Sequence, residues 1–118
     1  MNFYTVPGIK AKITPQYLTV PNQMKLAEQI IEQVANFYET DPLLVRSKDR
    51  NGHTVKVRHM AIYMVLQKVK GMSLKRLGML VARDHTSIIH ARKCINDQLS
   101  AKHDNEYKND VKILMQII

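Results

Sequence analysis

The sequence predicts an all-α domain with five or six helices around one core. Apolar residues repeat at helical spacing along most of the chain, residues suited to cap helices precede these repeats, and no segment shows the sustained alternation of a strand. The chain has 118 residues, the size of one domain, which can bury about two-thirds of its unfolded surface. We therefore expect one helical domain.

Residues 1–20 show no sustained period and contain Pro7, Gly8 and Pro15, so they predict an extended arm before a domain of residues 21–118. The arm lacks the charged start, apolar middle and cleavage site of an export signal. No apolar run reaches the ~18 residues that a membrane span needs. We expect a cytoplasmic protein with no membrane contact, and the single cysteine agrees with a reducing compartment.

The first long helix is predicted over about residues 22–39, with Asn22 as its N-cap after Pro21. Asp41-Pro42 then predicts a short helical turn, because proline suits the first helical position. The inner face of the long helix is expected to be formed by Ala27, Ile30, Ile31, Val34 and Tyr38.

Residues 46–54, RSKDRNGHT, predict a loop rich in basic residues, because Asn51-Gly52 is a turn signal. A second long helix fits residues 55–70 and would end before Gly71. Its expected core residues are Val57, Met60, Ala61, Met64 and Val65.

Two helices with a tight connection follow. Ser73 predicts the N-cap of a helix of about two turns that contains Leu74, Leu77, Gly78 and Val81. Asp84 lies near the start of the next helix, whose inner face is expected to be Ile88, Ala91, Ile95 and Leu99. A last helix over 106–117 is expected to bury Tyr107, Val111, Leu114 and Met115.

The net charge of +8 is concentrated in one part of the chain. Residues 46–93 hold twelve Lys or Arg against two acids, Asp49 and Asp84, so this segment carries +10 and the remainder −2. A basic concentration of this kind attracts polyanions, of which nucleic acid is the commonest. The plainer alternative is a solvated basic face.

Catalysis and metal binding have little support. No glycine-rich phosphate loop is present, so we expect no bound nucleotide. Cys94 lies beside Ile95, which favours a packed thiol over a nucleophile. His85 and His90 are five residues apart, which directs them about 140° from each other on a helix and does not suit a shared zinc ion. We expect no enzyme, no cofactor and no metal.

The short helix from Ser73 and the longer helix from about Asp84 have the layout of a helix-turn-helix, whose second helix enters the DNA major groove by its first residues. Histidine can meet a base edge, a threonine methyl can contact thymine, and aspartate can accept from cytosine N4. Asp84 is also a candidate cap, and either histidine could instead pack between helices. The residues placed at this end are Arg83, Asp84, His85, Thr86 and Ser87, with Lys93 two turns further on.

The segment "RDHTSIIHARKCI" resembles the signature G-R-D-H-T-T/S-V-x-H-A-x-x-K-I of the C-terminal DNA-binding domain of the bacterial DnaA replication initiator. Upstream, "VANFYETDPLLVRSKDR" resembles the first helix and following loop of that domain, and "VRHMAIYM" resembles its "ARQIAMYL" segment. Together these segments cover about residues 22–100.

The resemblance implies a helix-turn-helix domain related in fold to the Trp repressor, which binds duplex DNA at short asymmetric origin boxes. By position, Asp84, His85 and Thr86, with Ser87 beside them, would read the major groove, and Arg50 would reach the minor groove. The candidates for backbone or edge contacts are Arg58, His59, Lys75, Arg83 and Lys93.

The chain departs from this family in having Val81-Ala82 where the family has Gly-Gly, so a different turn is expected. It lacks the family's ATPase module, so we expect no ATP-driven filament and no origin melting by this chain alone. Our first hypothesis is a stand-alone protein, of the kind that a phage or mobile element encodes, that binds DnaA-box-like sites and competes with, recruits or mimics a host initiator. One alternative is a transcriptional regulator that uses the same module and could form a dimer through the N-terminal arm or the last helix. Another is a basic domain that docks an acidic protein.

Overall fold

The computed structural model describes residues 19–118, so the expected arm lies, up to residue 18, outside the described residues. The described part of the chain contains six α-helices and no strand, which confirms the all-α prediction. No helix in this range is long and apolar enough to span a bilayer. The helices are α1 (Val20–Phe37), α2 (Pro42–Val45), α3 (Gly52–Lys68), α4 (Leu74–Val81), α5 (His85–Leu99) and α6 (Glu106–Ile117).

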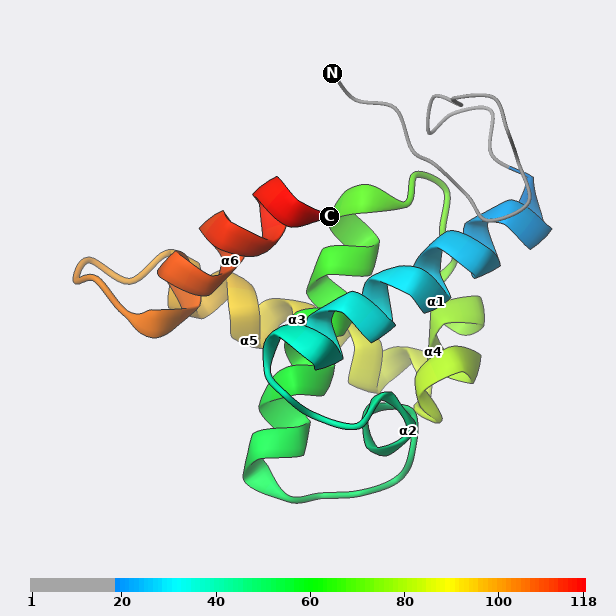
Figure 1. The fold of residues 1–118 in the computed structure, drawn as a ribbon, viewed down its shortest axis with the longest axis horizontal. Helices are drawn as coiled ribbons and strands as arrows, with labels where there is room; N and C mark the ends of the chain where they lie inside the picture. The colour runs from blue at the N-terminus through cyan, green and yellow to red at the C-terminus, as the bar shows by residue number, and fades with distance from the viewer. Residues whose placement is uncertain (1–18) are drawn as a thin grey trace.

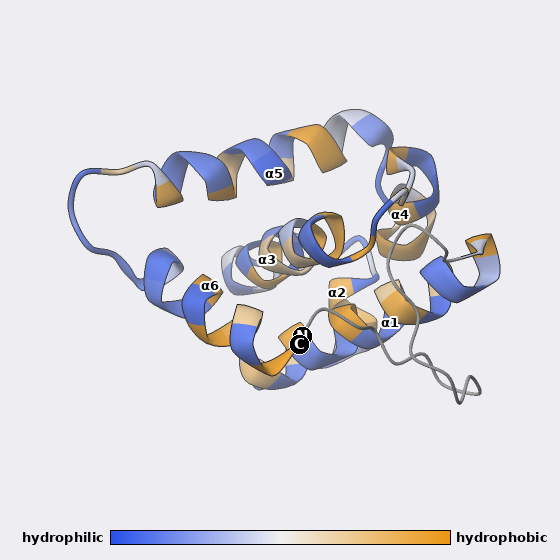
Figure 2. Cartoon of the chain, turned by 90° about the horizontal axis from the view of Figure 1, so that it is seen from above, coloured by the Kyte–Doolittle hydropathy of each residue, from blue (hydrophilic) through white to orange (hydrophobic). Residues whose placement is uncertain are grey.

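Helix α3 lies at the centre of the fold, with α1 and α5 packed on opposite sides of it and α6 beside it (Figures 1 and 2). Every residue from Met60 to Val65 is buried, so this helix is covered over most of its circumference. Burial of each large apolar side chain contributes about 1.5–3 kcal/mol to folding. The core thus fixes α3 as the support on which α1 and α5 are held.

Helix α1 begins earlier than predicted. Thr19, not Asn22, is its N-cap: the Thr19 Oγ1 accepts a hydrogen bond from the Asn22 backbone N–H at 3.4 Å. Pro21 is tolerated inside the first turn because the missing N–H has no helical partner there. The proline was interpreted as a residue before the helix, whereas it lies within it, and residues 19 and 20 do not belong to an extended arm.

Helix α3 also begins before its predicted start at residue 55. Asn51 is its N-cap, with Asn51 Oδ1 accepting from the His53 backbone N–H at 3.0 Å, and Gly52 is the first helical residue. The interpretation of Asn51-Gly52 as a turn was therefore wrong, because asparagine is equally suited to an N-cap. The loop between α2 and α3 is shortened to residues 46–51, which we call the basic loop.

Helix α6 agrees with its predicted bounds but not with its whole predicted face. Leu114 is fully buried and Tyr107 and Val111 pack partly against the core. Met115, which was expected to be buried, is 40% exposed. Helix α6 packs on the domain by one narrow side, and Met115 is turned about 100° from the buried Leu114, which directs it towards solvent.

A polar cluster joins α6 to the rest of the fold. The Tyr38 hydroxyl, just after α1, donates to Asp110 Oδ2 at 2.7 Å. Lys56 Nζ of α3 lies 2.8 Å from Glu106 Oε1 and 5.3 Å from the centre of the Tyr38 ring. Burial, and secondarily the hydrogen bond to Asp110, raises the pKa of Tyr38 above its ordinary value.

This cluster predicts a specific loss of stability at alkaline pH. Above about pH 10 the unfolded chain releases the Tyr38 proton while the folded chain retains it, so the free energy of unfolding falls as pH rises. We expect Tyr38→Phe to cost about 1–2 kcal/mol at neutral pH and to remove this part of the alkaline decline. Urea unfolding between pH 8 and 11 measures both effects. Tyr107→Phe, which keeps the Tyr38–Asp110 hydrogen bond, is the control, and an unchanged slope in Tyr38→Phe would contradict the assignment.

Candidate nucleic-acid interface

Helices α4 and α5 form a compact helix-turn-helix. Ser73 caps α4 as predicted, with its Oγ accepting from the Arg76 backbone N–H at 3.0 Å. The turn closes through the Arg83 backbone N–H, which donates to the Gly78 carbonyl at 2.9 Å. Ala82 adopts the left-handed conformation, with φ of 55°. Alanine therefore occupies a conformation that favours glycine, at one of the two positions where the DnaA-type signature has Gly-Gly.

Gly78 makes this turn possible. A Cβ at position 78 would lie 2.3 Å from the Arg83 carbonyl oxygen, which is closer than van der Waals contact allows. The absence of a side chain thus lets α4 and the start of α5 approach closely. Helical spacing predicts that Gly78 lies on this helix but gives no reason for a glycine there.

The residues at the start of α5 have three different roles: one caps the helix, others are exposed at the surface, and others pack in the core. Asp84 is the N-cap, with Asp84 Oδ1 accepting from the Ser87 backbone N–H at 2.9 Å. Hydrogen bonds from the Ser87 backbone and hydroxyl lower the pKa of the Asp84 carboxyl, so it remains ionised. His85 and Thr86 are exposed, and Ser87 is half-buried. As predicted, the residues that hold α5 to the core are Ile88, Ala91 and Ile95.

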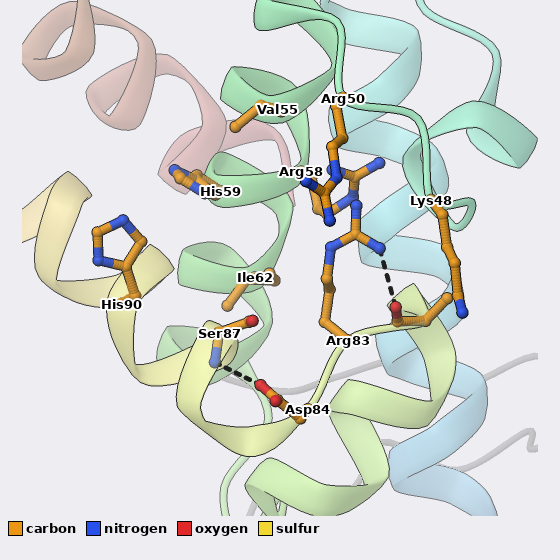
Figure 3. Close-up of a pocket in the computed structure, with 11 residues that line it drawn as sticks. Lys48, Arg50, Val55, Arg58, His59, Ile62, Arg83, Asp84, Ser87 and His90 are labelled. Atoms are coloured by element: carbon orange, nitrogen blue, oxygen red, sulfur yellow. Dashed lines mark hydrogen bonds between the residues drawn. The ribbon is translucent and has the colours of Figure 1, made fainter.

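The basic loop, α3 and the helix-turn-helix meet at a pocket of about 390 Å³ (Figure 3), which we call the basic pocket. Its charged lining contains four Lys or Arg residues and one acid, so its electrostatic potential favours an anion. Figure 3 shows the Arg50 and Arg83 side chains directed toward the same space from opposite sides. The polar lining is Lys48, Arg50, Arg58, His59, Arg83, Asp84, Ser87 and His90.

Two residues of this lining were not among the predicted site residues. Lys48 was counted only in the charge of its segment, and His90 was considered as a histidine between helices. The rings of His90 on α5 and His59 on α3 pack edge to face, with centroids 5.9 Å apart and planes at 85°. Burial, then His90, Arg58 and Arg83, lower the pKa of His59. His90 Nε2 also lies 3.3 Å from Cys94 Sγ.

Two of the predicted cationic residues lie outside the basic pocket. Lys75 on α4 and Lys93 on α5 are exposed and do not line the basic pocket. Lys93 Nζ lies 2.8 Å from Asp97 Oδ2, one turn along the same helix. Among the described residues, no group of three or more His, Cys, Asp or Glu side chains is arranged to hold a metal ion.

Arg58 differs most from expectation. It was predicted to contact DNA directly, yet it is 2% exposed and lies beneath the basic loop. Its Nε donates to the Val45 carbonyl at 2.9 Å, and its Nη2 is close to three further carbonyls. Its Nε and Nη2 are therefore bonded within the protein, while the side chain also lines the basic pocket, and the expected contact of Arg58 with DNA stays a prediction.

A model of the family described as bacterial dnaA protein helix-turn-helix matches residues 27–95. The chain belongs to this family. The DnaA match runs from α1 into α5 and includes the basic loop, the turn at Ala82 and the first turn of α5. Helix α6 follows the matched segment.

Curated relatives carry the same family name. The chromosomal replication initiator protein DnaA of Burkholderia multivorans is 31% identical over 102 residues, which cover 86% of this chain and 19% of that protein. The protein of the same name from Herpetosiphon aurantiacus is 30% identical over 91 residues, or 76% of this chain and 19% of the relative. The chain therefore spans about a fifth of the length of the DnaA proteins that it matches.

Proposed function

We propose that this chain binds duplex DNA in a sequence-specific manner, at DnaA-box-like sites, in the initiation of replication or its control. The first turn of α5 enters the major groove, where His85 and Thr86 meet base edges and Asp84 accepts from a cytosine amino group. Arg50 extends from the basic loop into the adjacent minor groove. The domain acts by binding and has no catalytic role of its own, and it would work in the cytoplasm at the nucleoid.

One observation carries this proposal: the exposed first turn of a capped α5 adjoins a pocket lined by Lys48, Arg50 and Arg83. Base edges lie at the floor of the major groove, and phosphates lie along its rim. A protein that recognises a sequence therefore needs polar side chains that contact bases, next to cations that contact phosphates. The first turn of α5 supplies the polar side chains, and the basic pocket supplies the cations. Membership in the DnaA helix-turn-helix family supports the same function.

Phosphate contacts would come from cations around this end. Lys48 and Arg83 line the basic pocket, and Lys75 of α4 lines a second pocket together with His85. Lys93 is exposed on α5, two turns beyond the start of that helix. His59 and Ser87 complete the proposed set at the pocket wall. Because each neutralised phosphate releases counterions, affinity should fall steeply with salt, by a factor of about 10³ between 50 and 200 mM if six phosphates are contacted.

Selection of bound duplexes from a random pool tests the proposal. We expect the purified protein to enrich one short asymmetric motif, and a DnaA-box-like motif would support the replication role. Enrichment of an unrelated motif would favour the transcriptional alternative, in which the same surface reads another site. Failure to enrich any motif, together with binding to an acidic protein at the same salt concentration, would favour the protein-docking alternative and contradict sequence-specific DNA binding.

A further inference from the structure

Arg58 is a cation enclosed by the backbone of the basic loop and α2. Its Nε donates to the Val45 carbonyl at 2.9 Å. Its Nη2 lies 3.3 Å from the Leu44 carbonyl, 3.0 Å from that of Ser47 and 2.9 Å from that of Asp49. One side chain from the central helix thus contacts four carbonyls spread over six residues of the preceding segment.

The loop has few other means of holding its shape. Helix α2 has only four residues, so its last carbonyls need partners from outside it. The Val45 carbonyl accepts from Arg58, and the Leu44 carbonyl accepts from the Ser47 hydroxyl at 2.6 Å as well as from Arg58. The Ser47 N–H at the start of the loop donates to the Leu44 carbonyl of α2 at 3.1 Å, and Arg46 Nε donates to the Leu80 carbonyl of α4 at 2.9 Å. Beyond Ser47, the Ser47 Oγ accepts from the Asp49 N–H at 3.1 Å, and Arg58 contacts the Asp49 carbonyl. The segment that carries Lys48 and Arg50 is therefore fixed mainly by side chains.

Guanidinium chemistry suits this position. The fork of an arginine distributes several donors in a plane and keeps its charge when buried, whereas a lysine presents its donors from one nitrogen atom. Burial, then the nearby Arg83, lowers the pKa of Arg58, and Asp49 opposes this shift. The carbonyl dipoles around the guanidinium compensate its lost hydration.

We propose that Arg58 is a positioning residue, which holds the basic loop so that Lys48 and Arg50 flank the α5 N-terminus, and that it does not contact DNA itself. This inference rests on the proposed function for its effect on binding. Its effect on the loop is independent of DNA, because the four carbonyl contacts exist in the free protein. The effect of Arg58 on the loop and its effect on DNA binding can therefore be tested separately.

The first experiment measures loop order in the free protein. Lys48 and Arg50 are exposed, so trypsin can report how well the loop is held. We expect Arg58→Lys and Arg58→Gln both to increase cleavage after these residues by about tenfold or more, since local opening governs proteolysis. Their thermal unfolding midpoints should stay near that of the wild-type protein. If both variants are cleaved at the wild-type rate, or if both lose the whole fold, Arg58 does not act specifically on the loop and the inference is overturned.

The second experiment separates positioning from direct contact by salt-dependent binding to the selected duplex. A direct phosphate contact would survive in Arg58→Lys, and its loss in Arg58→Gln would reduce the slope of log affinity against log salt by about 1. A positioning role predicts that both variants lose affinity alike, by roughly tenfold, with a slope reduced by more than 1 because two loop cations are displaced together. Arg50→Lys and Arg50→Gln are the matched controls at an exposed loop arginine. Wild-type affinity in Arg58→Lys would overturn the inference.

Discussion

Gly78→Ala is expected to destabilise the protein by about 2 kcal/mol or more, although alanine favours helices by up to about 1 kcal/mol over glycine. The new Cβ would lie 2.3 Å from the Arg83 carbonyl oxygen. That oxygen belongs to the backbone of the turn, so it cannot move aside as the end of a flexible side chain could. Either α4 separates from α5 or the turn distorts, and the Arg83 N–H to Gly78 carbonyl hydrogen bond is weakened in both cases.

Thermal unfolding measures this effect, with a decrease in midpoint of roughly 4 °C for each kcal/mol expected for a domain of this size. Gly52→Ala is the matched control, because nothing lies within 4 Å of a Cβ at that helical glycine. We expect its midpoint to remain close to wild type. A Gly78→Ala protein as stable as Gly52→Ala would show that the turn adapts and that the close approach is not required.

His85→Ala is expected to reduce discrimination between the selected duplex and an unrelated one by about 1–3 kcal/mol, or roughly 5- to 150-fold. His85 is exposed in the first turn of α5, and Asp84 rather than His85 caps the helix, so its removal should leave the fold intact. Thr86→Ala should act similarly through loss of a methyl contact with thymine. Competition binding with both duplexes at one salt concentration measures the ratio of the affinities.

Lys93→Ala provides the contrasting result. Lys93 is exposed and paired with Asp97 at 2.8 Å, and an exposed pair of this kind contributes little to stability. A cation that contacts only phosphate should weaken binding to both duplexes equally and leave their ratio unchanged. If His85→Ala changes neither the ratio nor the affinity, α5 is not the recognition helix. If Lys93→Ala changes the ratio, Lys93 reads bases and its assignment is wrong.

Regular elements could be predicted because their signals are local. The apolar residues of α1 and α3 repeat at helical spacing, and Ser73 and Asp84 are residues whose side chains cap helices well. Thr19 and Asn51 were missed because the neighbouring Pro21 and Gly52 also suit loops. Met115 was assigned inward because periodicity alone does not say how wide the buried side of a helix is.

The basic pocket could not be predicted because it depends on how distant segments pack. Lys48, Arg58 and Arg83 come from a loop, the central helix and a turn, and only the packing of α3 against α5 brings them together. The burial of Arg58 was also outside the reach of sequence patterns, since arginine is seldom buried unless partners are supplied. Those partners are backbone carbonyls. Every residue has one, so no residue type in the sequence indicates which carbonyls will surround Arg58.

The cap on α5 has a consequence for how the protein could change during evolution. Asp84 fixes the start of α5 through Ser87 and, in the proposed complex, also accepts from a base. Its carboxylate is held by this bond before DNA binds, so binding needs less ordering of that side chain. A substitution that relaxes base preference at this position would also fray the helix that carries His85 and Thr86. New target preferences should therefore arise more easily at those two residues than at Asp84.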